Sequence, residues 1–337
     1  MGYEILNSRF DEILVELSKE YEILAPFKVK GGGRYSDTDN IKYMKVKTLS
    51  DIEYKEKSMF SAKEVVFPAT ETLFHIQNDE VIEPVHTAKK RLVFLRACDI
   101  HAMDRVDNIF LKNGLIEDPY YKKKRDEVSF VLMGCQKSFE NCFCVSMGTN
   151  VAKEYSLGID FSEETVNIEV RDEDFAKYFE GQKEITFETS YVVENDTKVS
   201  TPNPENIDPS FFNDEMWEDY AKRCIGCGRC NFSCPTCSCF TTTDISYDDN
   251  SEVGERRRVW AGCHVDKFTD MAGGHSFRND YGSRMRYKTM HKVYDYKKKF
   301  GDHMCVGCGR CDDRCPEYIS FANCINKVTE KTGKEVL

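Results

Sequence analysis

Two cysteine runs with the same spacing constrain this chain more than any other feature of its sequence. One run begins at Cys224 and the other at Cys305, and both follow the pattern C-x2-C-x2-C-x3-C-P through Pro235 and Pro316. The chain holds 16 cysteines in 337 residues, a density at which chance would almost never place two such runs. The spacing is typical of bacterial proteins that hold two iron–sulfur clusters. We therefore interpret both runs as cluster-binding segments.

The chemistry of such a run predicts which thiolates share a cluster. Three thiolates separated by two residues can surround one corner of an iron–sulfur cube, whereas the fourth cysteine usually ligates the partner cluster. Glycines between the cysteines let the backbone approach closely. The sequence therefore predicts one [4Fe-4S] cluster on Cys224, Cys227, Cys230 and Cys315, and a second on Cys305, Cys308, Cys311 and Cys234.

Zinc is the main alternative metal, because paired C-x2-C groups also bind zinc. The alternative of a different class is thus a zinc-binding structural or regulatory protein. A zinc site is complete with four ligands, so it gives no reason for a third and fourth cysteine followed by proline in each run. Disulfides are less favoured still, because the first residues carry no secretion signal and we expect a cytoplasmic, reducing setting.

Length and charge exclude several classes of function. A chain of 337 residues is long enough for about two domains. Its formal net charge of -11 argues against binding to nucleic acid, because no global positive field would attract phosphates. No apolar run approaches the roughly 18 residues that a membrane span requires. We expect neither nucleic acid nor a membrane as a partner, and no set of catalytic residues can be assigned from spacing.

The predicted fold class is α+β. An N-terminal α/β domain is expected over residues 1–200, followed by a mainly helical, ferredoxin-like domain for two [4Fe-4S] clusters over residues 214–337. Prolines among polar residues predict a linker at 201–213. Twelve of the sixteen cysteines lie after position 220, so the second domain is the cysteine domain.

The N-terminal domain contains a predicted βαβ unit. Apolar runs at 91–96 and 128–133 flank a predicted helix at 100–111, with Asp99 as its N-cap. Two strands joined in this way are expected to be parallel. The apolar spacing also predicts a helix over residues 3–24 and a short strand at 64–67.

Four further cysteines fall in this domain and predict a third [4Fe-4S] cluster. They are Cys98, Cys135, Cys142 and Cys144. Cys98 follows the first strand of the βαβ unit and Cys135 follows the second, so parallel pairing places both at one edge of the sheet. The alternative is that these residues are simply small buried side chains, the commonest state of a free cysteine.

The remaining cysteines and the basic segments lead to weaker predictions. Cys237, Cys239, Cys263 and Cys324 have no recognised metal-binding spacing, so packing near the clusters is favoured over a further metal site. The basic stretch at 284–299 is interpreted either as a solvated helix face or as a docking site for an acidic partner. The arginines at 256–258 are interpreted in the same way.

These motifs resemble the iron–sulfur electron-transfer subunit of the anaerobic sulfite reductase complex. The most specific part is residues 231–240, NFSCPTCSCF. Residues 96–102, RACDIHA, and the cysteines at 135, 142 and 144 are similar to N-terminal motifs that this family shares with the β subunit of soluble NAD(P)H-linked hydrogenases.

The resemblance implies a non-catalytic iron–sulfur subunit of an oxidoreductase complex. Its partners would be a flavin subunit that oxidises NADH and a sirohaem subunit that reduces sulfite to sulfide. The alternative is the electron-transfer β subunit of a soluble NAD(P)H-linked hydrogenase, with the same mechanism and a different terminal partner. No flavin or sirohaem site can be assigned on this chain, which fits a relay between two other subunits.

Overall fold

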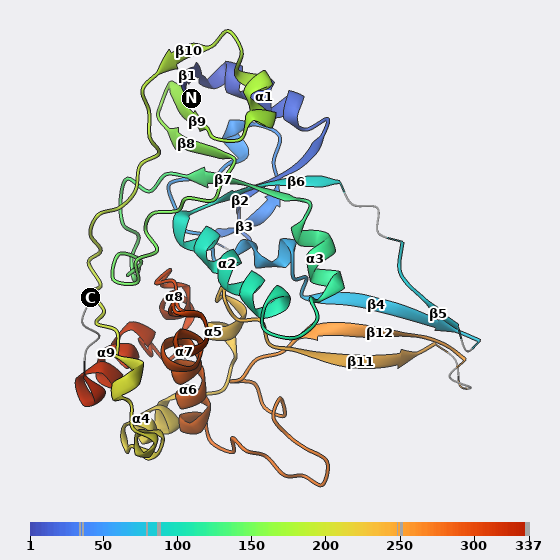
Figure 1. Ribbon diagram of the computed structural model, residues 1–337, viewed down its shortest axis with the longest axis vertical. Coiled ribbons are helices and arrows are strands. Elements are labelled where there is room, and N and C mark those ends of the chain that lie inside the picture. The colour runs from blue at the N-terminus through green and yellow to red at the C-terminus, as the bar shows by residue number, and fades with distance from the viewer. Residues whose placement is uncertain are drawn as a thin grey trace.

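The computed structural model of the protein describes residues 1–33, 35, 37–78, 80–85, 89–247, 249 and 252–333. A large sheet lies at one end of the molecule and the cysteine-rich helices at the other, with helices α2 and α3 between them (Figure 1). The mixture of a sheet-based part and a cysteine-rich helical part agrees with the predicted α+β class. Within the described residues, no helix is both long enough and apolar enough to cross a membrane.

The large sheet has eight strands among the described residues, in the order β10-β1-β9-β8-β7-β6-β2-β3. Strands β2, β6, β7 and β8 are parallel neighbours, and the outer strands pair antiparallel. The bounds are β1 (Gly2–Leu6), β2 (Tyr21–Val29), β3 (Asn40–Lys45), β6 (Lys90–Leu95), β7 (Val128–Met133), β8 (Leu157–Phe161), β9 (Thr165–Val170) and β10 (Lys183–Ile185).

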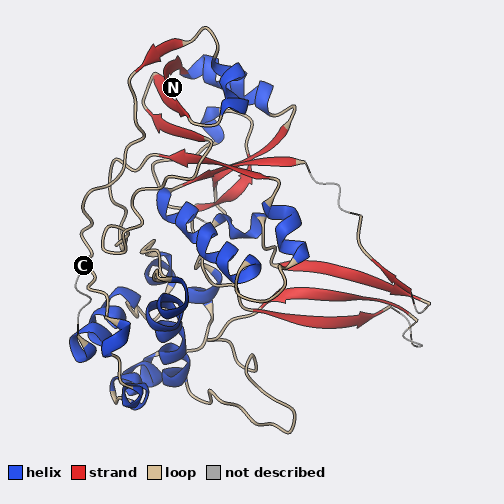
Figure 2. Ribbon diagram, viewed as in Figure 1, coloured by secondary structure: helices blue, strands red, loops and turns tan. Residues whose placement is uncertain are grey.

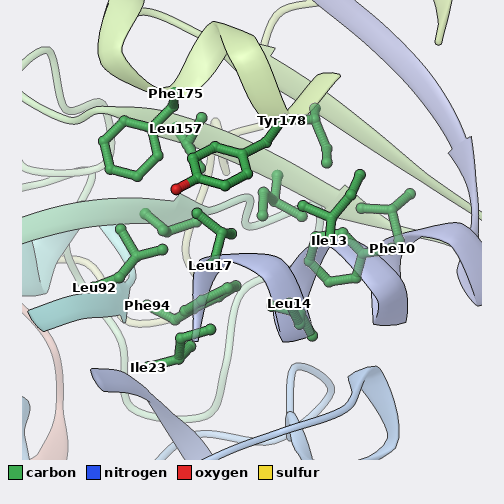
Figure 3. Close-up of a cluster of buried hydrophobic side chains, with 14 of the residues drawn as sticks. Phe10, Ile13, Leu14, Leu17, Ile23, Leu92, Phe94, Leu157, Phe175 and Tyr178 are labelled. Carbon is green, nitrogen blue, oxygen red and sulfur yellow. The ribbon is translucent and has the colours of Figure 1, made fainter. Parts of the chain in front are cut away.

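The central strands are buried on both faces because helices cover both sides of the sheet. In β6, Leu92 and Phe94 pack into the core on the side of helix α1 (Asn7–Leu17), which Figure 3 shows together with Phe10 and Leu14. Val93 alternates with them and packs on the opposite side, against helices α2 (Ala97–Leu111) and α3 (Pro119–Arg125). This alternation follows from the period of two in a strand.

The predicted βαβ unit is present. Strands β6 and β7 pair in parallel, and α2 follows β6 directly. Helix α2 begins two residues before Asp99, with Arg96 as its N-cap, so the predicted capping role of Asp99 is wrong. Asp99 instead lies in the first turn and is buried.

Two other predictions of secondary structure are wrong. Residues 3–24 form strand β1, helix α1 and the start of strand β2 rather than one helix, because Tyr3 and Ile5 alternate into the sheet core before the helix begins. Residues 64–67 do not form a strand. Their first two residues end the short 3-10 helix η2 (Ala62–Val65), whose N-cap Ser61 accepts a hydrogen bond from the Lys63 amide.

A second sheet joins distant parts of the chain. It has the order β11-β12-β4-β5 and projects to one side of the molecule as a ribbon of strands (Figure 2). Its bounds are β4 (Thr70–Gln77), β5 (Glu80–Ile82), β11 (Phe240–Ser246) and β12 (Val253–Trp260). Each predicted domain thus contributes two strands, and the cysteine-rich half contains a hairpin in addition to helices.

Arg258 links this sheet to the N-terminus of helix α3 through ion pairs. It is buried and pairs with Glu71 on β4 at 2.9 Å and with Asp118 at 2.7 Å. Asp118 is also the N-cap of α3. The interpretation of the arginines at 256–258 as a solvated or docking face is therefore wrong for Arg258, whereas Arg256 is exposed and pairs with Asp244.

The cysteine-rich half is built on short helices. They are α4 (Met216–Arg223), α5 (Arg229–Phe232), α6 (Tyr281–Met290), α7 (Tyr296–Phe300), α8 (Arg310–Arg314) and α9 (Phe321–Thr332). A π-helical turn, η6 (His291–Asp295), joins α6 to α7. Short 3-10 helices complete the chain: η1 (Leu49–Asp51), η3 (Glu173–Phe179), η4 (Pro204–Asn206) and η5 (Pro209–Asn213). The last two occupy the predicted linker, where Phe211 is buried in the core around α4, α6 and α9.

Candidate metal centres

The four thiols predicted for the first cluster line one cavity. Cys224, Cys227 and Cys230 reach it from the first run, and Cys315 reaches it from the end of the second run. Cys311, which the sequence assigns to the second cluster, also lines this cavity. The fourth cysteine of the second run therefore lies beside the first three cysteines of the first run.

Glycines shape the backbone around these thiols. Gly226 and Gly228 have positive φ values of 66° and 70°, which residues with a side chain adopt only at a cost in energy. Gly228 is the N-cap of α5, so the turn that it makes directs Cys230 into the cavity. The amide of Gly226 donates a hydrogen bond to the sulfur of Cys224 at 3.4 Å, an interaction that favours a thiolate.

The second run repeats the backbone of the first. Gly307 and Gly309 have φ values of 64° and 70°, and Gly309 is the N-cap of α8 as Gly228 is of α5. Burial is the main cause that raises the pKa of Cys305 to about 12 and that of Cys308 to about 11, and the nearby charge of Cys234 contributes to both pKa shifts. Cys234 from the first run is thus within electrostatic range of these two thiols of the second run.

Three buried lysines surround these sulfurs. Lys63, Lys288 and Lys292 are each at most 3% exposed. In the described part of the chain no carboxylate forms an ion pair with any of them. Their ammonium groups bond instead to the carbonyl of Cys237 at 2.8 Å, the carbonyl of Cys230 at 3.3 Å and the hydroxyl of Thr236 at 2.7 Å, respectively.

The charges of Lys288 and Lys292 are compensated by sulfur, whereas burial is the largest effect at Lys63 and lowers its pKa. Burial alone would lower the pKa of Lys288 and of Lys292, but neighbouring thiolates, Cys230 for Lys288 and Cys234 for Lys292, raise both pKa values overall. A buried cation without a partner would cost several kcal/mol. Burial of Lys288 and Lys292 therefore requires negative charge on the cysteines or on a group that they bind.

Sequence reasoning missed this role of the basic stretch. The prediction of a solvated or docking face at 284–299 is wrong for Arg284, Lys288 and Lys292, which are buried. Lys288 and Lys292 are four residues apart across the start of the π-helical turn, a spacing that puts both on one side of the helix. The sequence feature that could have indicated this role is a pair of lysines at helical spacing between the two cysteine runs.

The third group of cysteines also gathers at one place. Cys98, Cys135, Cys142 and Cys144 line a single cavity, together with Cys308 of the second run. Cys98 is the second residue of α2 and Cys135 follows β7, so the carboxyl ends of two parallel strands bring them together as the sequence predicts.

The remaining cysteines are packed among protein groups. The side-chain amide of Asn231 contacts the sulfurs of Cys237 at 3.6 Å and Cys263 at 3.1 Å. Cys324 lies fully buried on α9 and contacts the hydroxyl of Thr289 at 3.4 Å. No described feature assigns Cys324 to a metal.

The donors at the first run fit a [4Fe-4S] cluster, because its four thiols line one cavity, and Cys305 and Cys308 of the second run interact electrostatically with Cys234. Iron takes thiolates, and thiolates form in a buried site only when positive charge compensates them, which iron and the buried lysines supply. Among the described residues, no three His, Cys, Asp or Glu side chains converge on one point as ligands of a single ion do. In a cube each iron binds its own thiolate, so the four thiolates stand at separate corners.

Comparison with known proteins agrees with this chemistry. Residues 223–319 match the family model of the 4Fe-4S dicluster domain. Along nearly its whole length the chain is similar to sulfhydrogenase 2 subunit beta of Pyrococcus furiosus, with 28% identity over 354 residues that cover 98% of this chain and 99% of the relative. No solved structure gives a significant match. The prediction of two [4Fe-4S] clusters is confirmed, and the protein is an iron–sulfur electron-transfer protein.

Proposed function

We propose that this chain is the electron-transfer β subunit of a multi-subunit NAD(P)H-linked hydrogenase. The observation that carries the proposal is the similarity to sulfhydrogenase 2 subunit beta, because it covers 98% of the chain and so extends beyond the dicluster domain into the N-terminal sheet. The partners would be a flavin subunit that exchanges electrons with NAD(P)H and a nickel–iron subunit that exchanges them with hydrogen.

The role of this chain is to hold and insulate the clusters. When bound, each cluster supplies one-electron transfer without making or breaking a bond. We assign Cys224, Cys227, Cys230 and Cys315 to one cluster and Cys305, Cys308, Cys311 and Cys234 to the other. The crossed placement of Cys315 in the first cavity supports this pairing. The apolar core around α4, α6 and α9 limits access of water, and the buried lysines balance charge.

A second candidate is the corresponding iron–sulfur subunit of an anaerobic sulfite reductase. The segment 231–240 favours it, because this stretch carries the most specific part of the resemblance to that complex. The flavin partner would then oxidise NADH, and a sirohaem protein would replace the nickel–iron partner. The cysteines of this chain would have the same task in both complexes.

Purification of the intact complex under nitrogen tests the proposal. We expect a brown complex with nickel and flavin but without sirohaem, and with at least about eight irons on this chain. The measurements are metal analysis by mass spectrometry and extraction of flavin and sirohaem. Sirohaem without nickel would overturn the hydrogenase assignment in favour of sulfite reductase. A colourless complex with zinc and little iron would overturn both.

Replacement of Lys288 tests the charge balance at the clusters. Lys288→Met keeps a long apolar side chain but removes the positive charge beside Cys230 and Cys311. Because reduction adds negative charge, we expect the midpoint potential of at least one cluster to fall by on the order of 100 mV. Redox titration followed by EPR measures this shift. Lys298→Met, at an exposed position of α7, is the matched control and should leave the potentials unchanged. Equal potentials in all three proteins would show that Lys288 does not act on the clusters.

A further inference from the structure

We propose that Cys98, Cys135, Cys142 and Cys144 hold a third [4Fe-4S] cluster, and that it exchanges electrons with the cluster on the second cysteine run. The matched dicluster domain begins at residue 223, so it does not include this site. The metal site is argued from these cysteines alone. Only the role of this cluster in electron transfer rests on the function proposed above.

The four thiols come from three separate segments and meet in one cavity. The parallel strands β6 and β7 end side by side, and the chain continues from them into Cys98 and Cys135. The loop after β7 then returns Cys142 and Cys144 to the same cavity, where both are 7% exposed. Besides Cys308 of the second run, four buried or half-buried thiols line this cavity, and four is the ligand number of a cube.

Polar groups lie beside two of the four sulfurs, those of Cys142 and Cys144. The Asn195 side chain is 3% exposed, and its amide nitrogen contacts the sulfur of Cys144 at 3.7 Å. Its oxygen lies at the same distance from that sulfur and accepts a hydrogen bond from the Val145 amide at 2.8 Å. Its nitrogen donates to the hydroxyl of Ser138 at 2.9 Å, so the amide is fixed beside the sulfur. The ammonium group of Lys57 lies 3.7 Å from the sulfur of Cys142. Hydrogen-bond donors and cations of this kind stabilise thiolates that bind a metal.

The loop of this site is in direct backbone contact with the loop of the second cysteine run. The Phe143 amide donates to the carbonyl of Gly307 at 2.7 Å, and the sulfur of Cys142 lies 3.5 Å from the carbonyl oxygen of Cys308. Thr149 adds a hydrogen bond to the carbonyl of Val306 at 2.7 Å. One ligand residue of each proposed cluster is thus in contact with a ligand residue of the other.

Of the two cysteine runs, only the second has glycines packed against the backbone of the loop that carries Cys142 and Cys144. A Cβ atom on Gly307 would lie 2.5 Å from the carbonyl oxygen of Phe143, and one on Gly309 would lie 2.3 Å from that of Asn141. Neither space accepts a side chain. In the first run the equivalent Gly226 faces the ring of Tyr281 instead. The third site therefore adjoins the cluster of Cys305, Cys308 and Cys311. Electrons would pass between these two clusters.

Electron transfer between the two sites needs no other chemistry. One electron leaves the donor cluster, which is oxidised, and enters the acceptor cluster, which is reduced. No covalent bond changes, and the thiolates stay bound to iron. The reductant is external to this chain: NAD(P)H through the flavin partner in the complex, or dithionite in the test below.

Cys135→Ser tests the site with the least disturbance, because among the interactions described Cys135 makes a backbone hydrogen bond to Ser190 and none to the second run. The full chain is purified and reconstituted with iron and sulfide under nitrogen. We expect about twelve irons in the natural chain and a loss of about four in the variant. After reduction with dithionite, the EPR spectrum of the variant should lack one cluster signal and the broadening that it causes on its neighbour. Cys324→Ala is the control, with unchanged iron and spectrum.

A natural chain with about eight irons, or a Cys135→Ser variant with as much iron as the natural chain, would overturn the proposal. Cys98→Ser is the second variant, and it should lose the same signal because it removes another ligand of the same cluster. Loss of two different signals in the two variants would contradict a shared site. All of these measurements use this chain alone, so they are independent of whether the partner is a hydrogenase or a sulfite reductase.

Discussion

Cys227→Ser should remove one [4Fe-4S] cluster and, in the proposed hydrogenase complex, abolish electron flow between NAD(P)H and the nickel–iron subunit. Cys227 is an exposed cysteine that lines the cavity of the first cluster, so its replacement disturbs little packing. A serine hydroxyl is a poor substitute, because soft thiolate ligands select iron–sulfur clusters. We expect a loss of about four irons per chain and of one reduced-cluster EPR signal. Hydrogen-dependent reduction of NAD(P) by the assembled complex should fall to background.

The control for this variant separates electron relay from catalysis. Hydrogen-dependent reduction of a dye that takes electrons directly from the proposed nickel–iron partner should be unchanged, because in the proposed complex that reaction does not use this chain. Cys324→Ala, at a buried cysteine on α9, should keep both iron and electron flow. If Cys227→Ser loses its iron but retains full reduction of NAD(P), the first cluster is not on the path. If it keeps all of its iron, the ligand assignment is wrong.

The cysteine chemistry was predictable because it is local. Ligands separated by two or three residues need only a short loop and a glycine with positive φ, and both runs fold in this way at Gly228 and Gly309. The gathering of Cys98 and Cys135 was also predictable, since parallel strands place their carboxyl ends at one edge. In both cases the spacing in the sequence determines the geometry.

The buried lysines could not be predicted because their surroundings are formed by distant segments. Lys63 reaches the cysteines from the N-terminal half, where it bonds to the carbonyl of Cys237. Lys288 is on a helix with mixed polar and apolar residues, and such a helix is usually solvated on its charged side. Only the tertiary arrangement shows that this side faces sulfur.

The second sheet could not be predicted for a related reason. Strand β12 pairs with β4, and Val253 lies opposite Gln77, so the register depends on residues far apart in the sequence. Strand propensity depends strongly on such context. The N-terminal residues 3–6 illustrate the same limit, because the antiparallel pairing of β1 with β9 overrides a pattern that also suits a helix.

Asp99→Leu should destabilise the protein by about 3–5 kcal/mol, which corresponds to roughly 6–20 °C in Tm. Asp99 on α2 and Arg310 on α8 form a buried bidentate pair at 2.6 and 2.8 Å, with exposures of 1% and 2%. Removal of the carboxylate leaves the guanidinium buried without its counter-charge, although its bonds to Ser58 remain. Thermal unfolding under nitrogen measures the loss.

The double variant Asp99→Leu/Arg310→Met identifies the cause of that loss. Because it removes both charges, it should recover most of the stability, whereas loss of packing alone would make the double variant worse than either single one. Asp244→Asn, which breaks the exposed pair with Arg256, is the control and should change Tm little.

The same pair joins the sheet edge at Cys98 to the helix that follows Cys308. Asp99 is adjacent in sequence to Cys98, and Arg310 is two residues after Cys308, so the pair holds the two loops in register. We therefore expect the single variant to weaken EPR coupling between the proposed third cluster and the cluster of the second run, even at temperatures where the variant remains folded. The double variant should recover stability more fully than coupling, because Leu and Met restore packing but not the directed bonds. Equal recovery of both would show that burial alone, and not the ion pair, sets the approach of the two loops.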